Sequence, residues 1–296
     1  MSKRLENRIC IVVGGGQTAG ATLGNGKATA LRFAQEGATV LVADRNLASA
    51  TDTADTVVAG GRQRQRHPGR CDGRGGSPPH GPGLPRPPWA HRRAAQQCRF
   101  SSEGGDSPID SITEDVFDRI HAINLRGMVM TCKHTLEAMV RQGSGVIVNV
   151  GSIAAFNVHP TVAYKTSKAG VIALTQHIAV KYAALRIRAN CILPGSMATP
   201  MAVDGAARRR GIDPAVLSAQ RDACVPLRHK QGTAWDVANA ALFLASSEAD
   251  FITGINLPVD GGALAFVGNW GRRAMTVVFR RQSTLSLSTS ANTRLT

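Results

Sequence analysis

Apolar and polar positions along the first sixty residues follow two alternating patterns, which predict strands and helices in turn. Residues 8–13 (RICIVV) form a short apolar run that ends in glycines, as buried strands do. Residues 26–38 carry apolar side chains at helical spacing and stop at Gly37. Residues 39–44 (TVLVAD) predict a second strand and residues 47–61 a second helix. This order predicts right-handed crossovers and a parallel sheet.

The alternation resumes after residue 110. Residues 111–143 predict a long helix that begins at a capping pattern around Ser111 or Thr113 and is interrupted near Gly127. The expected elements beyond it are strands at 145–152, 187–196 and 254–262 and helices at 162–185 and 233–246. Residues 201–231 interrupt this order, and we interpret them as a mobile helical insertion over a binding site. The fold class is therefore α/β, with a doubly wound parallel sheet.

Two segments do not follow these patterns. Residues 62–100 contain nine arginines, seven prolines and a single acid, Asp72. Residues 266–296 are rich in serine and threonine and lack periodicity, which predicts a disordered tail. We therefore expect one domain over residues 1–265 that contains the anomalous segment.

The net charge of +15 would favour a nucleic-acid or acidic-membrane partner if it belonged to the folded body. Residues 62–99 contribute +8 and residues 269–296 contribute +5, so the remaining chain is nearly neutral. No apolar run approaches the roughly 18 residues of a membrane span, and no signal segment is expected at the start. The six cysteines are scattered without a CxxC pair, which favours reduced thiols in the cytoplasm and no metal site.

The glycine-rich turn between the first strand and the first helix is the first candidate site. Gly15, Gly24 and Gly26 would let the backbone approach a pyrophosphate at the helix N-terminus. Asp44 ends the next strand, where a carboxylate can accept hydrogen bonds from ribose hydroxyls and repel a 2′-phosphate. The simpler alternative is a glycine-rich turn followed by a capping aspartate.

A second candidate site lies further along the chain. Tyr164 and Lys168 are four residues apart and share one face of a predicted helix, where the ammonium would stabilise the phenolate. Ser152 follows the strand GVIVNV, at the edge where open α/β sheets bind ligands. An exposed helical pair and a turn serine are the alternatives for these residues taken alone.

In one order, the chain carries the glycine loop, Asp44, HAINLRG, GVIVNVGS, AYKTSKAG, NCILPGSMATPM and FITGINLPVDGG. In these motifs it resembles the short-chain dehydrogenase/reductase family, over residues 8–60 and 101–265. The resemblance implies a single Rossmann-type domain and an NAD-dependent oxidoreductase, with NAD rather than NADP as cofactor. It also implies hydride exchange with a secondary alcohol or ketone, and a homotetramer or homodimer.

The resemblance also assigns roles to residues. Tyr164 is implied to donate and accept the proton, with Lys168 as its partner and as a contact to the nicotinamide ribose. Ser152 is implied to stabilise the substrate oxygen, and Asn124 to hold a water in the proton relay. The cofactor-binding set would be Gly15, Gly24, Gly26, Asp44, Tyr164, Lys168, Pro194, Gly195, Met197 and Thr199. No metal is implied.

The chain departs from the family pattern in its loop and in its middle. Gly14 stands where the family has threonine, about five extra residues separate Gly15 from Gly24, and the Ser152–Tyr164 spacing is one residue short. Residues 62–100 replace the family's third strand, which ends in a D-V-T-D-like motif, and its fourth strand, which ends in N-N-A-G. We therefore expect both strands to be disrupted.

We interpret residues 62–100 as the same gene segment read one base out of frame. Back-translated and read one base later, residues 89–99 permit GRIDVLHNNAG, and residues from Arg70 onward permit DVTDEA. The alternative is a genuine Pro/Arg-rich insertion that binds nucleic acid or a partner protein. For the function of the whole chain, the alternatives to an active oxidoreductase are a catalytically impaired remnant or a protein that binds through this basic segment. This segment has few aromatic residues for base stacking, namely Trp89 and Phe100, which favours a small-molecule partner over nucleic acid or membrane.

Overall fold

A computed structural model describes residues 3–60, 92–96, 105–157 and 159–265. The chain divides into two compact units, Met1–Ala263 and Leu264–Thr296, and nearly all of the second lies outside the described residues. The expected tail at 266–296 also lies outside them. The following account concerns the first unit.

The first unit is built on a six-stranded parallel sheet with strand order β2-β1-β3-β4-β5-β8. Its strands are β1 (Ile9–Val13), β2 (Thr39–Ala43), β3 (Arg92–Gln96), β4 (Gly145–Val150), β5 (Ile187–Pro194) and β8 (Asn256–Val259). The order reverses at β1, so the chain winds to both sides of this strand, as the predicted doubly wound fold requires. The fold class is confirmed.

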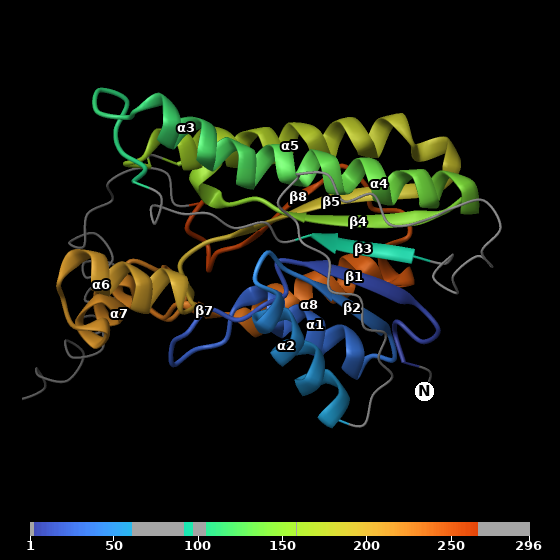
Figure 1. Cartoon of the computed structure of the whole chain (residues 1–296), viewed down its shortest axis with the longest axis horizontal. Helices are drawn as coiled ribbons and strands as arrows, with labels where there is room; N and C mark the ends of the chain where they lie inside the picture. The colour runs from blue at the N-terminus through green and yellow to red at the C-terminus, as the bar shows by residue number, and fades with distance from the viewer. Residues whose placement is uncertain (1–2, 61–91, 97–104, 158, 266–296) are drawn as a thin grey trace, which may run out of the picture. The chain divides into compact units, whose positions relative to one another are not determined.

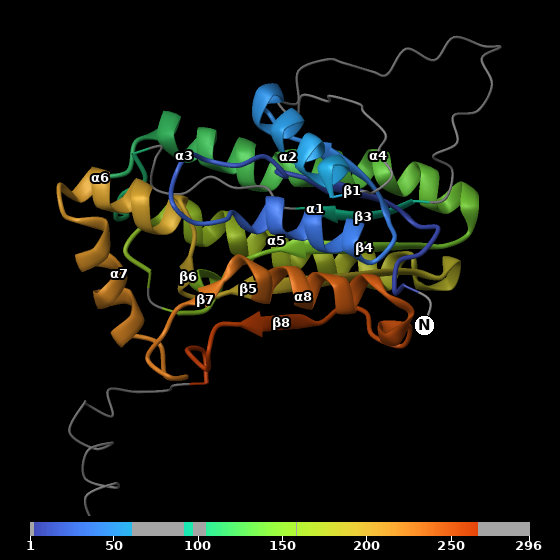
Figure 2. The same cartoon turned by 90° about the horizontal axis from the view of Figure 1, so that it is seen from below.

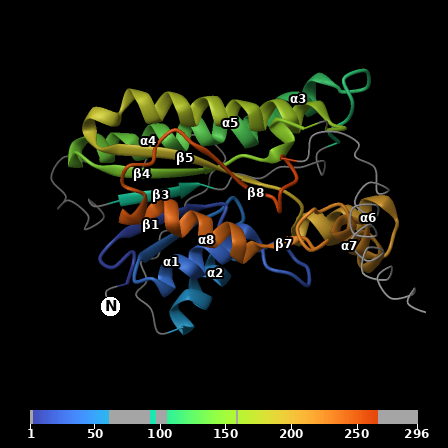
Figure 3. The same cartoon turned by 180° about the vertical axis from the view of Figure 1, so that it is seen from behind.

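Helices cover both faces of the sheet. One face carries α1 (Asn25–Gln35), α2 (Leu47–Ala59) and α8 (Ala234–Ala245). The other carries α3 (Glu114–His121), α4 (Gly127–Gln142) and α5 (Val162–Lys181), as Figures 1 and 3 show from opposite sides. Because every residue of β4 and β5 is buried between these layers, their sequences are almost continuously apolar rather than alternating.

Two apolar clusters fill the layers. The larger lies between the sheet and α1 and α8, and includes the fully buried side chains of Phe33, Leu242 and Leu244. The smaller lies beneath α4 and α5 and includes Met139 and Ile147. Most of these side chains are aliphatic, in keeping with an aromatic content of 4%. These clusters pack the strands against the helices, and the candidate site lies on the loops that follow the carboxyl ends of the strands.

At the centre of the sheet the structure differs from the expectation of a disrupted fourth strand. Residues 92–96 of the anomalous segment form β3, which pairs in parallel with β1 over five residues and with β4 over three. Pairing of strands uses backbone amides and carbonyls, and RRAAQ supplies all of them because it contains no proline. The sequence predicted that the family's fourth strand is disrupted. This prediction is wrong for residues 92–96, which form β3 at that place in the sheet. The expected place of the third strand lies outside the described residues.

The predicted interruption near Gly127 is a change of helix type. Residues Ala122–Arg126 wind as a π-helix (η2) between α3 and α4, and the backbone stays right-handed throughout. Residues 201–231 contain a second π-helical turn (η5, Met201–Gly205), α6 (Ala206–Arg210) and α7 (Pro214–Ala223). A two-stranded pair, β6 (Met197–Ala198) and β7 (Gly232–Thr233), closes the base of this insertion. The helical character of the insertion is therefore confirmed. Figures 1 and 2 show α6 and α7 beyond the carboxyl ends of the strands.

Candidate active site

Tyr164 and Lys168 lie in the first two turns of α5. The Lys168 Nζ is 5.8 Å from the centroid of the Tyr164 ring and donates a hydrogen bond of 3.0 Å to the carbonyl of Val150, the last residue of β4. Lys168 is 3% exposed, so its ammonium has a fixed place beneath the tyrosine. The ring of His159 also lies near Tyr164, with a centroid separation of 5.3 Å. The structure thus brings the predicted Tyr–Lys pair to the end of a central strand.

Ser152 begins the short turn that follows β4. Its Oγ accepts a hydrogen bond from the amide of Ala154 and caps the 3₁₀ turn Ile153–Ala155. The Lys165 Nζ donates to the carbonyls of Ala154 and Asn157, at 3.1 and 2.7 Å. Lys165 stands on α5 next to Tyr164, so it fastens the serine turn to the tyrosine helix.

Asn124 lies at the middle of the π-helical turn η2 and is fully buried. Its Nδ2 donates a 3.1 Å hydrogen bond to the Oγ of Ser167, the residue before Lys168. π-helical turns inside α-helices occur frequently at functional sites because the extra residue re-aims a side chain. The predicted Asn124 is thereby linked to the same segment of α5 as Tyr164 and Lys168.

The N-terminus of α5 is capped from a distant loop. Thr161, the N-cap residue, makes no side-chain capping bond. Instead, the carboxylate of Asp106 accepts hydrogen bonds from the amides of Ala163 and Tyr164, at 3.1 and 2.7 Å. The carbonyl of Ser107 accepts from the amide of Val162. These three amides would otherwise lack intrahelical partners, so residues 106–107 fix the turn that carries Tyr164.

The predicted glycines pack tightly between β1 and α1. A Cβ on Gly26 would lie 2.0 Å from the carbonyl oxygen of Gly14, and one on Gly15 would lie 2.7 Å from Val42. Gly24 is the N-cap residue of α1, where an extended backbone ends the loop. Only glycine therefore allows the first turn of α1 to pack so closely on the end of β1, as dinucleotide-binding folds require.

Asp44 follows β2, and its carboxylate faces the glycine loop. Oδ2 accepts a 3.0 Å hydrogen bond from the amide of Gly16, and Oδ1 accepts one from the amide of Asn46. A Cβ on Gly16 would meet this carboxylate at 2.8 Å. The predicted acid thus lies beside the predicted glycines.

The segment after β5 packs against the end of β8. Pro194 ends β5 opposite Val259, and the amide of Gly195 donates to the carbonyl of that same residue. Met197 and Thr199 are both buried, and the Thr199 amide donates to the Met197 carbonyl. A Cβ on Gly195 would collide with Asp260 at 2.6 Å, so this glycine is required by packing.

Cys191 is a buried thiol in β5 behind the site. Burial raises its pKa to about 11, an effect that hydrogen bonding at Gly151 and the charge of Lys168 reduce. The thiol therefore stays protonated near neutral pH and acts as a small apolar side chain.

The fold and these residues define a dinucleotide-binding α/β protein with a tyrosine–lysine pair at the carboxyl edge of its sheet. A family model described as enoyl-(acyl carrier protein) reductase matches residues 99–263, which is more than half of the chain. The (3R)-3-hydroxyacyl-CoA dehydrogenase of Rattus norvegicus is 32% identical over 271 residues, which cover 88% of this chain and 97% of that enzyme.

Two further proteins that are similar to this chain are also named as a dehydrogenase and a reductase. The 2-(R)-hydroxypropyl-CoM dehydrogenase of Xanthobacter autotrophicus is 39% identical over 150 residues, and the match spans 57% of that enzyme and 50% of this chain. The crystal structure of levodione reductase superposes with a TM-score of 0.75 at 26% identity, covering 88% of this chain and 99% of that one. The chain belongs to the short-chain dehydrogenase/reductase family, whose members are oxidoreductases that bind NAD or NADP.

The described residues include neither a membrane-spanning helix nor a metal-binding cluster. Within residues 3–60, 92–96, 105–157 and 159–265, no helix is both long and apolar enough to cross a bilayer. The same ranges contain no group of three His, Cys, Asp or Glu side chains that could hold a metal ion.

Three residues that shape the site were not identified from the sequence: Gln17, Asp106 and Lys165. Gln17 follows the glycines directly, but a glutamine in a loop has no distinctive spacing. Asp106 lies 58 positions from Tyr164, and Lys165 reaches carbonyls that any residue could present. Their contacts are tertiary, so no local pattern of the sequence reveals them.

Proposed function

We propose that this protein is an NAD-dependent oxidoreductase that interconverts a secondary alcohol and a ketone. The observation that carries the proposal is the buried Lys168, whose ammonium lies beneath the Tyr164 ring. In the proposed reaction Tyr164, held beside this buried ammonium, takes the hydroxyl proton of an alcohol or returns it to a carbonyl oxygen. The proton would move between the Tyr164 Oη and the substrate oxygen, and Ser152 would orient that oxygen by a hydrogen bond.

The residues present fit the dinucleotide. Gly26 packs directly against the Gly14 carbonyl, so α1 begins at the end of β1, where the N-terminus of a helix can bind a pyrophosphate. Asp44 would bind the adenosine ribose and select NAD, while Pro194, Gly195, Met197 and Thr199 would border the nicotinamide. When bound, the nicotinamide supplies the hydride acceptor or donor for the reaction. Asn124 would hold a water between Lys168 and solvent for the return of the proton.

The substrate would be a small secondary alcohol or ketone, because proton transfer by Tyr164 requires a hydroxyl or carbonyl oxygen. The relatives are named for different alcohols and ketones, including a hydroxyacyl-CoA, a hydroxypropyl-CoM and levodione. Phe156 is 57% exposed in the turn after Ser152, and His159 lies against Tyr164, so both are placed to contact a substrate. The helical insertion of α6 and α7 would cover the bound molecule.

The test is a titration of the full chain with NAD and NADP, followed by a screen of secondary alcohols for reduction of the bound dinucleotide. Tyr164→Phe should abolish turnover while NAD still binds, because it removes the proton-carrying hydroxyl and leaves the glycine loop and Asp44 unchanged. The control is Tyr182→Phe at the chain's other tyrosine, which lies at the end of α5 and should keep full activity. Salt-sensitive nucleic-acid binding without dinucleotide binding would instead support the alternative of a basic binding segment, which falls largely outside the described residues.

We also propose that copies of the chain associate. Large apolar side chains are exposed along the outer helices α3, α4 and α5, among them Phe117, Met130 and Val180. Their burial between copies would be favourable. Light scattering after size-exclusion chromatography distinguishes a dimer or tetramer from a monomer. A cytoplasmic location stays a prediction that rests on the scattered cysteines.

A further inference from the structure

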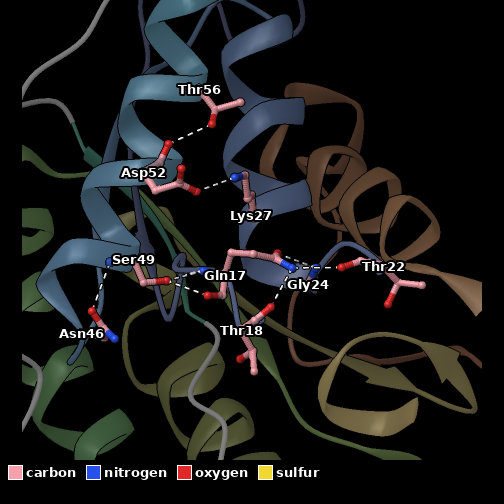
Figure 4. Close-up of polar contacts among 9 residues, drawn as sticks. All are labelled: Gln17, Thr18, Thr22, Gly24, Lys27, Asn46, Ser49, Asp52 and Thr56. Atoms are coloured by element: carbon pink, nitrogen blue, oxygen red, sulfur yellow. Dashed lines mark hydrogen bonds and ion pairs between the residues drawn. The ribbon is translucent and has the colours of Figure 1, made fainter. Parts of the chain in front are cut away.

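Gln17 uses every polar group of its side chain within one loop. Its Oε1 accepts a 2.9 Å hydrogen bond from the amide of Gly24. Its Nε2 donates to the carbonyls of Thr18 and Thr22, each at 2.9 Å. Figure 4 shows this amide lying across the loop, with its contacts directed at both ends. One side chain therefore closes residues 17–24 into a ring.

The backbone of Gln17 is fixed on its other side by α2. Its amide donates to the Oγ of Ser49 at 2.6 Å, and the Ser49 hydroxyl donates to the Gln17 carbonyl at 2.8 Å. The preceding residue, Gly16, donates to Asp44. Gln17 thus connects two parts of the site. One is Asp44, which is predicted to bind the ribose, and the other is Gly24, where α1 begins.

Beyond the bonds of Gln17, the loop is held where Gly20 lies close to Pro200 and Asp204, and where Leu23 packs against the cluster of Ala28, Ala234 and Ala238. Residues 18–21 are exposed, so burial of their small side chains contributes little to its conformation. The loop is also about five residues longer than the family pattern between Gly15 and Gly24. A longer flexible loop loses more entropy when its ends are held together, so the closing bonds of Gln17 help to offset that loss.

We propose that Gln17 is a positioning residue for the dinucleotide: it holds the extended loop closed, so that the N-terminus of α1 faces the pyrophosphate. Gln17 acts through Gly24 and through the loop backbone. This inference rests on the proposed function, since it assigns a role in binding the same cofactor. Without the side chain, the loop backbone and the start of α1 would no longer have a fixed orientation toward the phosphates.

The experiment is calorimetric titration of the full chain with NAD and with ADP-ribose, which carries the pyrophosphate and both riboses but no nicotinamide. Gln17→Ala should raise the dissociation constants of both ligands at least about tenfold, because three hydrogen bonds are lost. Gln17→Glu keeps the length and the acceptor for Gly24, but it loses both donors and adds a negative charge near the phosphates, so it should raise the dissociation constants at least as much as Gln17→Ala. The catalytic rate at saturating NAD should stay within about twofold, so that the defect appears in KM.

Thr56→Ala is the matched control. The Thr56 hydroxyl donates to the carbonyl of Asp52 within α2, further along this helix than Ser49 (Figure 4). This variant should bind both ligands as the unaltered chain does. Thermal unfolding of each variant shows whether it is folded at the temperature of the titration.

The outcomes separate the inference from the proposed function. If the unaltered chain binds neither NAD, NADP nor ADP-ribose, the proposed function fails, and the inference fails with it. If the unaltered chain binds and Gln17→Ala binds equally well, the inference alone is overturned. A lower unfolding temperature with unchanged binding also overturns it, because Gln17 would then only stabilise the fold.

Discussion

The carboxylate of Asp106 lies 2.7 Å from the backbone amide of Tyr164, although 58 positions separate them in the chain. Asp106 is 9% exposed and bonds also to the amide of Ala163. A negatively charged acceptor at a helix N-terminus is stabilised by the aligned peptide dipoles as well as by the hydrogen bonds. The orientation of the proposed proton carrier thus depends on a loop in another part of the sequence.

Replacing Asp106 should therefore affect stability and catalysis together. Asp106→Ala is expected to lower the free energy of unfolding by about 1–3 kcal/mol, because two buried amides lose their acceptors. It should also lower kcat at least about tenfold, since Tyr164 would lose its fixed position. Denaturant unfolding and steady-state kinetics measure the two effects.

The control for Asp106 is Asp213, which caps α7 through the amide of Ala215 but is exposed and belongs to a different helix. Asp213→Ala removes a similar capping bond and should leave kcat unchanged. Equal losses of kcat in both variants would show that capping of α5 has no special connection to catalysis.

Gly26 provides a test of the close packing at the start of α1. Gly26→Ala places a Cβ 2.0 Å from the Gly14 carbonyl oxygen, so either the loop or the helix must move. We expect a loss of stability of about 1–3 kcal/mol from overpacking and a rise of at least about tenfold in the dissociation constant of NAD. Gly127→Ala is the control, because a Cβ there meets the nearest atom at an ordinary 3.5 Å inside a helix. This control should be neutral or stabilising by up to about 1 kcal/mol, and a neutral Gly26→Ala would contradict the packing argument.

The sequence predicted most of the sheet and the helix α5, which carries Tyr164 and Lys168, because their signals are local. Continuous apolar runs identified β4 and β5, and helical spacing placed Tyr164 and Lys168 on one face. β3 was not predicted, because backbone pairing does not require apolar side chains and residues 92–96 have none of the usual strand pattern. Gln17 and Asp106 were missed for a related reason: each acts through backbone groups that folding brings close, and no spacing in the sequence encodes such contacts.

Cys191 and Cys224 should differ in reactivity. Burial raises the pKa of Cys191 to about 11 from an unfolded value of 9.0, so at pH 8 the folded chain presents almost no thiolate there. Cys224 is exposed at the end of α7. Iodoacetamide at pH 8, with the labelled sites identified by mass spectrometry, should modify Cys224 and spare Cys191 until the chain is unfolded.

The same shift gives a dependence of stability on pH. Because the folded pKa of Cys191 is above the unfolded one, the stabilising effect of the buried neutral thiol is complete below pH 9. It is lost as pH rises from 9 through about 11. Cys191→Ala should remove this part of the alkaline loss of stability, and labelling of Cys191 in the folded chain at pH 8 would contradict its burial.

Asp44 should decide between the two dinucleotides. Its carboxylate is held beside the loop by the amides of Gly16 and Asn46, so a 2′-phosphate on the ribose would meet a fixed negative charge. Asp44→Asn keeps an oxygen acceptor but removes the charge, and Arg45 stands next in the chain as a cation for the phosphate. The ratio of the NADP and NAD dissociation constants should therefore fall at least about tenfold. Asp52→Asn is the control, because Asp52 is an exposed acid on α2 that pairs with Lys27 (Figure 4), and it should leave the ratio unchanged. If Asp44→Asn also leaves the ratio unchanged, the carboxylate does not select the cofactor, and preference must come from residues beyond the end of β2.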